Sequence, residues 1–172
     1  MHLILIVLAA AQVAPPLPSV RGDRFQIMAP RGWKVVREGV EVLLEHSTGA
    51  SVAVRRPRES RQPRNLDVFA LDAVEQIMAP LGFAKFEAPR RFKEGNQESV
   101  QYEIRGNRLS AHRRILYRAV RRNAVVFEVV YENSEDRFDV LLTEAQSIAS
   151  SLEVIIEPPQ PPRGSTRGRG RN

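Results

Sequence analysis

Two stretches of the chain place apolar residues at helical spacing. From residue 66 to residue 81, apolar side chains recur at intervals of three and four, which puts them on one face of an α-helix. Asn65 is a suitable cap for the start of this helix, and Gly82 stands where a glycine commonly ends one. Residues 138–152 repeat the same spacing. Each predicted helix therefore has a single apolar face, which must pack against another layer of the fold.

The rest of the body alternates strand patterns with short turns. Turn sequences such as Glu38-Gly39 separate runs rich in β-branched and aromatic residues, and turns this short join antiparallel strands. The run at residues 125–131 is apolar on both of its faces, which is typical of a central strand covered on two sides. The predicted strands are residues 25–28, 34–37, 40–45, 51–56, 84–92, 99–105, 110–120 and 125–131. This order of elements predicts an α+β fold, in which an antiparallel β-sheet is sandwiched by two main amphipathic helices.

The first residues of the chain are typical of an export signal. Residues 3–11 form an apolar run of nine residues that ends in alanines, far short of the roughly 20 residues that span a bilayer. We therefore expect a signal peptide over residues 1–11, with residue 14 as an alternative end, and a proline-rich leader over residues 12–23. No lysine or arginine precedes the run, so a buried N-terminal strand is the alternative interpretation. The expected location is periplasmic, cell-envelope or secreted, with no transmembrane span in the mature chain.

Composition separates the folded body from a basic tail. Residues 156–172 are rich in proline, glycine and arginine and lack apolar periodicity, which predicts a disordered tail. Residues 24–155 are enough for one domain with a single core. The net charge is +6 at pH 7, and the share of it within the body is too small to indicate nucleic-acid binding. The chain has no cysteine, which excludes disulfides, thiolate chemistry and a lipid-modified cysteine anchor.

Four features follow one another along the body. They are a proline-to-tryptophan step after the first strand at residues 25–33, the helix at residues 66–81, an Arg-x-x-Tyr strand with its hairpin partner at residues 114–131, and a Tyr-Glu-Asn-Ser sequence before the last helix at residues 131–134. This order resembles the PsbP-like family, which includes bacterial exported proteins of the DcrB type. The resemblance implies an α/β/α sandwich around an antiparallel sheet and an accessory or binding role, as in the extrinsic subunits of photosystem II. It implies no shared catalytic site, and no functional residue is transferred by it.

Side chains suited to catalysis or metal binding do not converge in the sequence. His46 and His112 fall in different predicted strands without the ligand spacing of a zinc site, and surface positions explain both. Ser110 lies two residues before His112, but no carboxylate is placed to complete a triad and no Gly-x-Ser-x-Gly sequence occurs. We therefore expect no catalytic residue, no metal and no cofactor, and a protein that is not an enzyme.

Arginine is the strongest signal outside the predicted core. Its planar guanidinium suits carboxylate and phosphate partners, so clustered arginines indicate an anionic partner. A composition bias on solvated faces, with Glu and Asp interspersed, is the alternative explanation. The candidate contacts fall in a loop, a strand and the tail: Arg55, Arg56, Arg58, Arg61, Arg64, Arg113, Arg114, Arg118, Arg167, Arg169 and Arg171.

The sequence leaves three functional hypotheses open. The first is an exported, non-catalytic accessory or binding domain that works as a monomer and meets another protein or an anionic envelope surface. The second is a binder of anionic surfaces, such as lipid headgroups or cell-envelope polymer, through the loop and tail arginines. Nucleic acid is not a favoured partner of an exported chain. The third hypothesis is an enzyme with a cleft that the sequence does not reveal.

Overall fold

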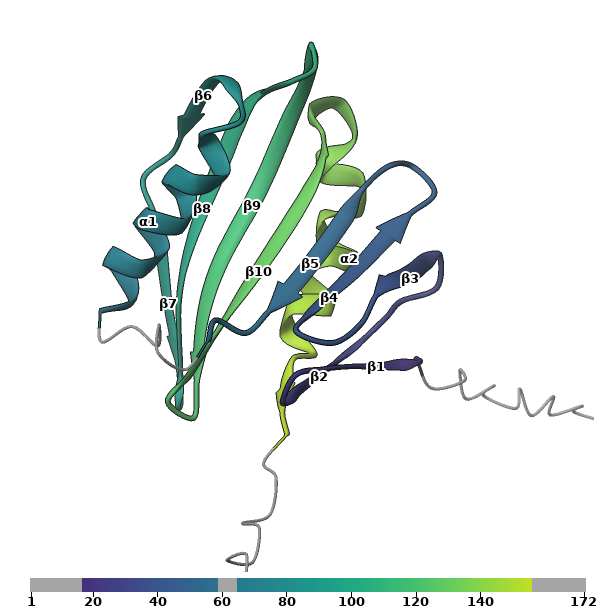
Figure 1. Cartoon of the computed structure of the whole chain (residues 1–172), viewed down its shortest axis with the longest axis vertical. Helices are drawn as coiled ribbons and strands as arrows, with labels where there is room; N and C mark the ends of the chain where they lie inside the picture. Colours follow the sequence, from purple (N-terminus) through teal and green to yellow (C-terminus); the bar gives the residue numbers. More distant parts are fainter. Residues whose placement is uncertain (1–16, 59–64, 156–172) are drawn as a thin grey trace, which may run out of the picture.

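One large sheet forms the centre of the fold. The computed structural model describes residues 17–58 and 65–155 (Figure 1). Within these residues eight strands join in the order β3-β4-β5-β10-β9-β8-β6, with β7 also paired to β8. They are β3 (Trp33–Arg37), β4 (Glu41–His46), β5 (Ser51–Arg55), β6 (Gly82–Phe86), β7 (Arg90–Glu94), β8 (Gln97–Arg108), β9 (Ala111–Arg122) and β10 (Val125–Ser134). Each pairing is antiparallel, as the short turns predicted.

A second, three-stranded sheet brings the two ends of the described chain together. β1 (Ser19–Gly22), β2 (Phe25–Met28) and β11 (Glu153–Val154) pair in the order β1-β2-β11. β1 falls within the predicted leader, so the folded part begins before residue 24. Val20 of β1 is buried in the core beside Phe25, which explains why this segment pairs with the sheet instead of extending away from it.

Two helices follow the predicted periodicity. α1 (Leu66–Met78) begins at Asn65, whose side chain accepts hydrogen bonds from the backbone N–H groups of Asp67 and Val68. It ends at Met78 and not at residue 81, because the following turn contains Pro80, which lacks a backbone N–H. α2 (Phe138–Ser150) is preceded by a 3₁₀ turn at Glu135–Arg137. None of the described helices combines the length and the apolar character that a membrane span requires.

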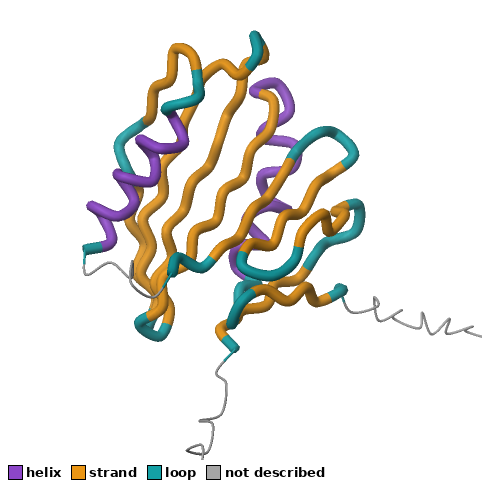
Figure 2. The backbone as a smooth tube through the Cα atoms, in the orientation of Figure 1, coloured by secondary structure: helices purple, strands orange, loops and turns teal. Residues whose placement is uncertain are grey.

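The helices pack against opposite faces of the large sheet. Successive residues of β10 point to opposite sides, so Val126 packs with α1 and Phe127 packs with α2. α1 lies over β8, β9 and β6, whereas α2 lies over β10 and β2. Figure 2 shows α1 in front of the sheet and α2 behind it. The predicted α+β class with an antiparallel sheet is confirmed. The finer prediction of a sheet sandwiched by the two helices is not confirmed, because each helix covers only part of its face.

The single strand predicted at residues 84–92 is wrong. The structure divides this segment into β6, which ends at Phe86, and β7, which begins at Arg90. Both strands pair with β8, β6 with its second half and β7 with its first half. The break contains Pro89, which has no N–H to donate to a neighbouring strand.

Candidate functional site

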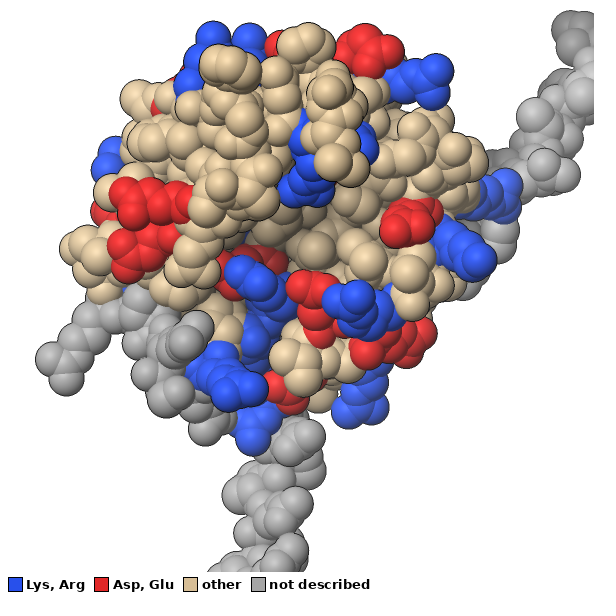
Figure 3. Space-filling model, turned by 45° about the horizontal axis from the view of Figure 1, so that its top comes forward, with Lys and Arg blue, Asp and Glu red and all other residues tan. Residues whose placement is uncertain are grey.

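Part of the sheet face that carries α1 is not covered by the helix. α1 lies over β8, β9 and β6, but the same face continues across β10, β5 and β4. Leu43, Ala53 and Val130 are paired positions on these neighbouring strands, and all three are partly exposed. We call this surface the open strip, defined by these three residues and the charged residues on either side of them. Figure 3 shows basic and acidic side chains gathered around a hollow in the molecular surface on this side.

An ion pair with a buried carboxylate borders the open strip. Glu128 of β10 is the paired position of Arg55 on β5, and it is only 4% exposed. Arg55 Nε donates to Glu128 Oε2 at 2.5 Å, and the Tyr117 hydroxyl donates to Oε1 at 3.2 Å. Both oxygens of the carboxylate therefore have a donor, which offsets the cost of burying its charge.

The same contacts fix the protonation of the two donors. The hydrogen bond from Arg55 to Glu128 raises the pKa of Arg55. Burial, reinforced by the charge of Glu128, raises the pKa of Tyr117 well above its ordinary value. Arg55 therefore stays charged and Tyr117 stays neutral. Arg55 and Tyr117 thus hold the Glu128 carboxylate in place between β5 and β9, with one hydrogen bond to each of its oxygens.

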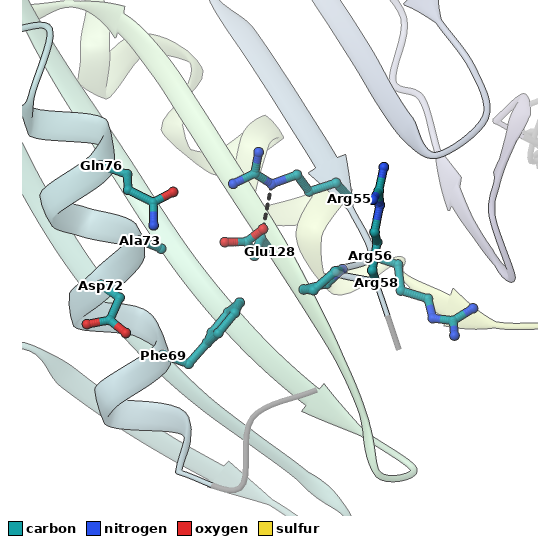
Figure 4. Close-up of a pocket in the computed structure, with 9 residues that line it drawn as sticks. Arg55, Arg56, Arg58, Phe69, Asp72, Ala73, Gln76 and Glu128 are labelled. Carbon is teal, nitrogen blue, oxygen red and sulfur yellow. Dashed lines mark hydrogen bonds and ion pairs between the residues drawn. The ribbon is translucent and has the colours of Figure 1, made fainter. Parts of the chain in front are cut away.

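A pocket of about 700 Å³ opens between this ion pair and α1 (Figure 4). Glu128 lies at its centre, and the ring of Phe69 points toward it from α1. The lining residues are Arg55, Arg56, Pro57, Arg58, Phe69, Asp72, Ala73, Gln76 and Glu128. The pocket thus combines three guanidinium groups, two carboxylates, an amide and an aromatic ring.

The loop after β5 holds two more of the predicted arginines, Arg56 and Arg58. Arg56 is 8% exposed, with Nη1 at 3.6 Å from Asp23 Oδ2, whereas Arg58 is exposed. Both also line a second pocket of about 350 Å³, together with Arg24. Arg55 and Arg56 are therefore engaged within the fold, and Arg58 faces solvent. Five further predicted contacts lie outside the described residues: Arg61, Arg64, Arg167, Arg169 and Arg171.

A second charged group borders the open strip on its other side. Arg108 Nη1 donates to both oxygens of Glu132, at 2.9 and 3.0 Å. Arg113 Nε lies 3.6 Å from Glu132 Oε1. With Glu45 and His46 these side chains line a pocket of about 260 Å³. The apolar centre of the open strip is thus flanked by ion pairs on both sides.

The predicted arginine cluster on β9 does not form one surface. Arg113 and Arg114 are consecutive strand residues, so they point to opposite faces of the sheet. Arg114 donates to Glu103 at 2.7 Å and to Asp139 at 3.0 Å. These contacts raise the pKa of Arg114, and the hydrogen bond from Arg114 lowers the pKa of Glu103. Arg114 therefore ties β9 to β8 and α2.

Arg118 is different again. It lies on the face that carries α2, where its Nε and Nη2 donate to Ser99 Oγ at 3.1 and 2.9 Å. Its guanidinium also lies 5.3 Å from the centre of the Phe92 ring. The three β9 arginines of the prediction therefore have three separate environments.

Two residues of the site were not among the predicted contacts. Glu128 interrupts the apolar run of β10, and a lone carboxylate in a strand predicted to be buried on both faces requires a cationic partner. That signal was available in the sequence. Tyr117 was part of the Arg-x-x-Tyr feature, but its partner depends on the register of β9 against β10, which residue spacing does not give.

The two histidines do not converge: His46 lines the smaller pocket beside the open strip, and His112 lies on β9. His46 stacks at a tilt against Trp33, with ring centres 5.5 Å apart, and His112 is exposed. The indole N–H of Trp33 donates to Glu144 of α2 at 2.8 Å, so this tryptophan packs between the first hairpin and the helix. Among residues 17–58 and 65–155, no group of three His, Asp or Glu side chains is placed to hold a metal ion.

No family model and no curated protein matches the chain. Solved structures do match. Cyanobacterial PsbP (CyanoP) of Synechocystis sp. PCC 6803 is 17% identical and superposes with a TM-score of 0.51, over 87% of this chain and 98% of that one. LpqN of Mycobacterium tuberculosis, described as involved in cell envelope biogenesis, is 11% identical with a TM-score of 0.53, over 77% of this chain and 83% of that one.

The Ran-binding protein Mog1p of Saccharomyces cerevisiae is also similar in structure. It is 11% identical with a TM-score of 0.54, over 77% of this chain and 90% of that one. Identities this low establish the fold alone. The chain has a PsbP-like fold, and the resemblance drawn from the four sequence features is confirmed at that level.

Proposed function

We propose that this chain is an exported, non-catalytic accessory domain that binds a partner protein through the open strip. The observation that carries the proposal is the row of Leu43, Ala53 and Val130, which lies on a sheet face that α1 covers elsewhere. An apolar row on a rigid sheet, flanked by ion pairs, has the apolar centre and polar rim of a protein interface.

The charges around the row define the kind of segment that fits. On one side lie Arg55 and the exposed Arg58, and on the other lie Arg108 and Glu45. A partner segment with apolar residues at its centre and a carboxylate near Arg58 matches this arrangement, because guanidinium groups pair well with carboxylates. Mog1p is described as a Ran-binding protein, which gives a precedent for protein recognition on this fold.

Three further parts of the proposal come from the sequence and the site. The apolar run at residues 3–11 supports export, and LpqN, described as involved in cell envelope biogenesis, is a precedent for this fold in that process. The pairing of Glu128, the most buried carboxylate of the pocket, with Arg55 and Tyr117 gives it a structural role, and this supports a binding function over a catalytic one. We expect the domain to act as a monomer.

Site-specific photocrosslinking tests the binding surface. A photoreactive amino acid replaces Leu43 in the open strip, and a matched control carries it at Val140, which is exposed on α2. In cells, the probe at position 43 should give one defined adduct that excess unlabelled protein competes away, and the probe at position 140 should not. Equal adducts from both positions, or none from position 43, would remove the open strip as the interface.

A second variant separates binding from folding. Ala53→Lys places a long cation in the middle of the row, and Val140→Lys makes the same kind of change on the other side of the molecule. We expect Ala53→Lys to abolish the adduct while both variants keep the Tm of the wild-type protein. Cell fractionation of the full chain tests export, and recovery of the protein in the cytoplasm at its full length would contradict it.

A specific observation also favours the second hypothesis, the binding of anionic surfaces. The pocket lined by Arg24, Arg56 and Arg58 holds a single carboxylate, that of Asp23. Removing residues 157–172 and replacing Arg58 by glutamine should then weaken binding to vesicles containing phosphatidylglycerol and reduce its dependence on salt. An unchanged salt titration would exclude this role for both segments.

A further inference from the structure

Arg118 is a partly buried cation with a neutral partner. Two of its nitrogens donate to the same hydroxyl, Ser99 Oγ, and Ser99 is only 1% exposed. Within the described residues no carboxylate oxygen lies within ion-pair distance of this guanidinium. Glu94, an exposed residue of β7, attracts it only at longer range. The desolvation of Arg118 is therefore not offset by a contacting charge.

Arg55 and Arg114 differ from Arg118 because each contacts a carboxylate. Hydrogen bonds to Glu128 and Glu103 raise the pKa of Arg55 and of Arg114, respectively. Burial lowers the pKa of Arg118. Of these three arginines, Arg118 is therefore the one that a bound anion would stabilise most.

A pocket of about 610 Å³ opens beside Arg118 on the face that carries α2. It is formed where the β7–β8 turn, the β9–β10 turn and the end of α2 meet. Arg122 lies on the same strand face as Arg118, and its Nη1 donates to the backbone oxygen of Leu152. The lining residues are Glu94, Gly95, Asn96, Gln97, Arg118, Arg122, Asn123 and Ser150. Most of these side chains can donate hydrogen bonds, and Glu94 supplies the one carboxylate of the lining.

We propose that this pocket binds the phosphate group of a small ligand, with Arg118 and Arg122 as its cationic contacts. The guanidinium of Arg118 has a nitrogen, Nη1, that its bonds to Ser99 leave available, and the amides of Asn96, Gln97 and Asn123 surround the same space. Arginine forks together with amide donors match the several acceptor oxygens of a phosphate. The site is independent of the open strip, which lies on the opposite face of the sheet.

Calorimetric titration and thermal shifts with inorganic phosphate test the site, at an ionic strength held constant with chloride. Phosphate should raise the Tm of the full chain in a saturable way, because a ligand that binds only the folded state stabilises it. Arg118→Gln should weaken phosphate binding by about tenfold or more, the effect of losing a charged hydrogen bond. Arg31→Gln, which removes an exposed arginine of the turn before β3, is the matched control and should leave the affinity unchanged.

Glu94→Gln decides between an anion site and an internal ion pair. If phosphate is the anion that Arg118 meets, removing the nearby carboxylate should tighten phosphate binding a few-fold and leave the Tm without phosphate unchanged. If Glu94 is the true partner of Arg118 in solution, Glu94→Gln lowers the Tm without phosphate and does not improve binding, and the proposal fails. It fails equally if Arg118→Gln binds phosphate as the wild-type protein does.

Two further probes identify the source of the phosphate. Glycerol 3-phosphate represents a free small molecule, and vesicles containing phosphatidic acid represent a lipid headgroup. Binding to either one that is lost in Arg118→Gln supports the site and names its source. Binding to vesicles that persists in Arg118→Gln but is lost on deletion of residues 157–172 contradicts it and assigns the interaction to the tail.

Discussion

Tyr117 and Glu128 are diagonal neighbours across the β9–β10 pair, and the tyrosine hydroxyl donates to Glu128 Oε1 at 3.2 Å while Arg55 donates to the second oxygen. The two partners of Glu128 are not equivalent. The carboxylate is 5% exposed at its side chain, whereas the Arg55 side chain is 45% exposed. The stability lost on removing one partner therefore depends on whether the charge left behind is the buried carboxylate or the half-exposed guanidinium.

We predict that Arg55→Gln destabilises the protein more than Glu128→Gln does. Arg55→Gln leaves a buried carboxylate with a single hydroxyl donor, and should cost about 3 kcal/mol, the lower end of the range for buried pairs because solvent screens Arg55. Glu128→Gln leaves an arginine that can turn to water, and should cost about 1–2 kcal/mol. Urea unfolding of the two variants and of the double variant measures both values. Equal losses would mean that the ion pair is as solvated as a surface pair.

Glu103 gives a prediction about pH. Hydrogen bonds from Arg114 and Arg105 lower its pKa in the folded protein below the ordinary value of 4.5. A carboxyl group with a lowered folded pKa contributes stability above its unfolded pKa, and this contribution is lost as the pH falls through the folded value. The wild-type protein should therefore exceed Glu103→Gln in unfolding free energy at pH 7, and the difference should shrink below pH 4.5. Denaturation at a series of pH values checks it, and a difference that grows toward acid would refute the assignment.

The sequence predicted the elements of this fold better than their extent. Helical spacing located α1 and α2 because an amphipathic helix shows its buried face in its own sequence. It could not show how far α1 reaches across the sheet, because Leu43, Ala53 and Val130 look like any other covered strand positions. Residue periodicity therefore could not predict the open strip. Pro89 was a sequence signal for the break between β6 and β7. The strand-like residues on both sides of Pro89 led to the prediction of one continuous strand.

The arginine prediction shows a second limit. Strand alternation alone separates Arg113 from Arg114, so a period-two argument already divides the β9 cluster between two faces. The carboxylates that neutralise Arg55 and Arg114 lie on neighbouring strands or on α2, 73 residues away in the case of Arg55 and Glu128. Register determines those partners, and residue composition does not. Counting arginines in the sequence therefore overestimates the positive charge that is available to a ligand.

Gly22 provides a test of how β1 is held. A Cβ atom added there would lie 2.1 Å from Cζ of Phe25, whose ring is fully buried against the glycine. Gly22→Ala should therefore cost about 2–3 kcal/mol, because the ring must leave its place in the core. Gly82→Ala is the matched control in β6, since the nearest atom to its added Cβ is 3.8 Å away. We expect it to change stability by less than about 0.5 kcal/mol. Similar Tm values for the two variants would show that β1 can move without disturbing Phe25.

Leu109 and Asn123 occupy matching places in two hairpin turns. Each is the first of two turn residues with left-handed backbone: φ is 49° and 67° at Leu109 and Ser110, and 50° and 63° at Asn123 and Ala124. Turns of this kind favour asparagine and glycine, since a larger side chain crowds the backbone when φ is positive. Asn123 follows that preference, whereas Leu109 does not. Leu109 is also 97% exposed, so burial of its side chain does not offset the strain of its backbone.

We therefore predict that Leu109→Asn stabilises the protein by about 1 kcal/mol, because it relieves backbone strain and removes no buried contact. For a domain of this size the Tm should rise by about 4 °C. Asn123→Leu is the reciprocal change and should lower the Tm by a comparable amount. Thermal unfolding of both variants, with urea unfolding to check the cooperativity, measures the two shifts. A lower Tm for Leu109→Asn would mean that the leucine side chain has a stabilising contact in the folded state, and opposite shifts of similar size would show that turn geometry alone accounts for both positions.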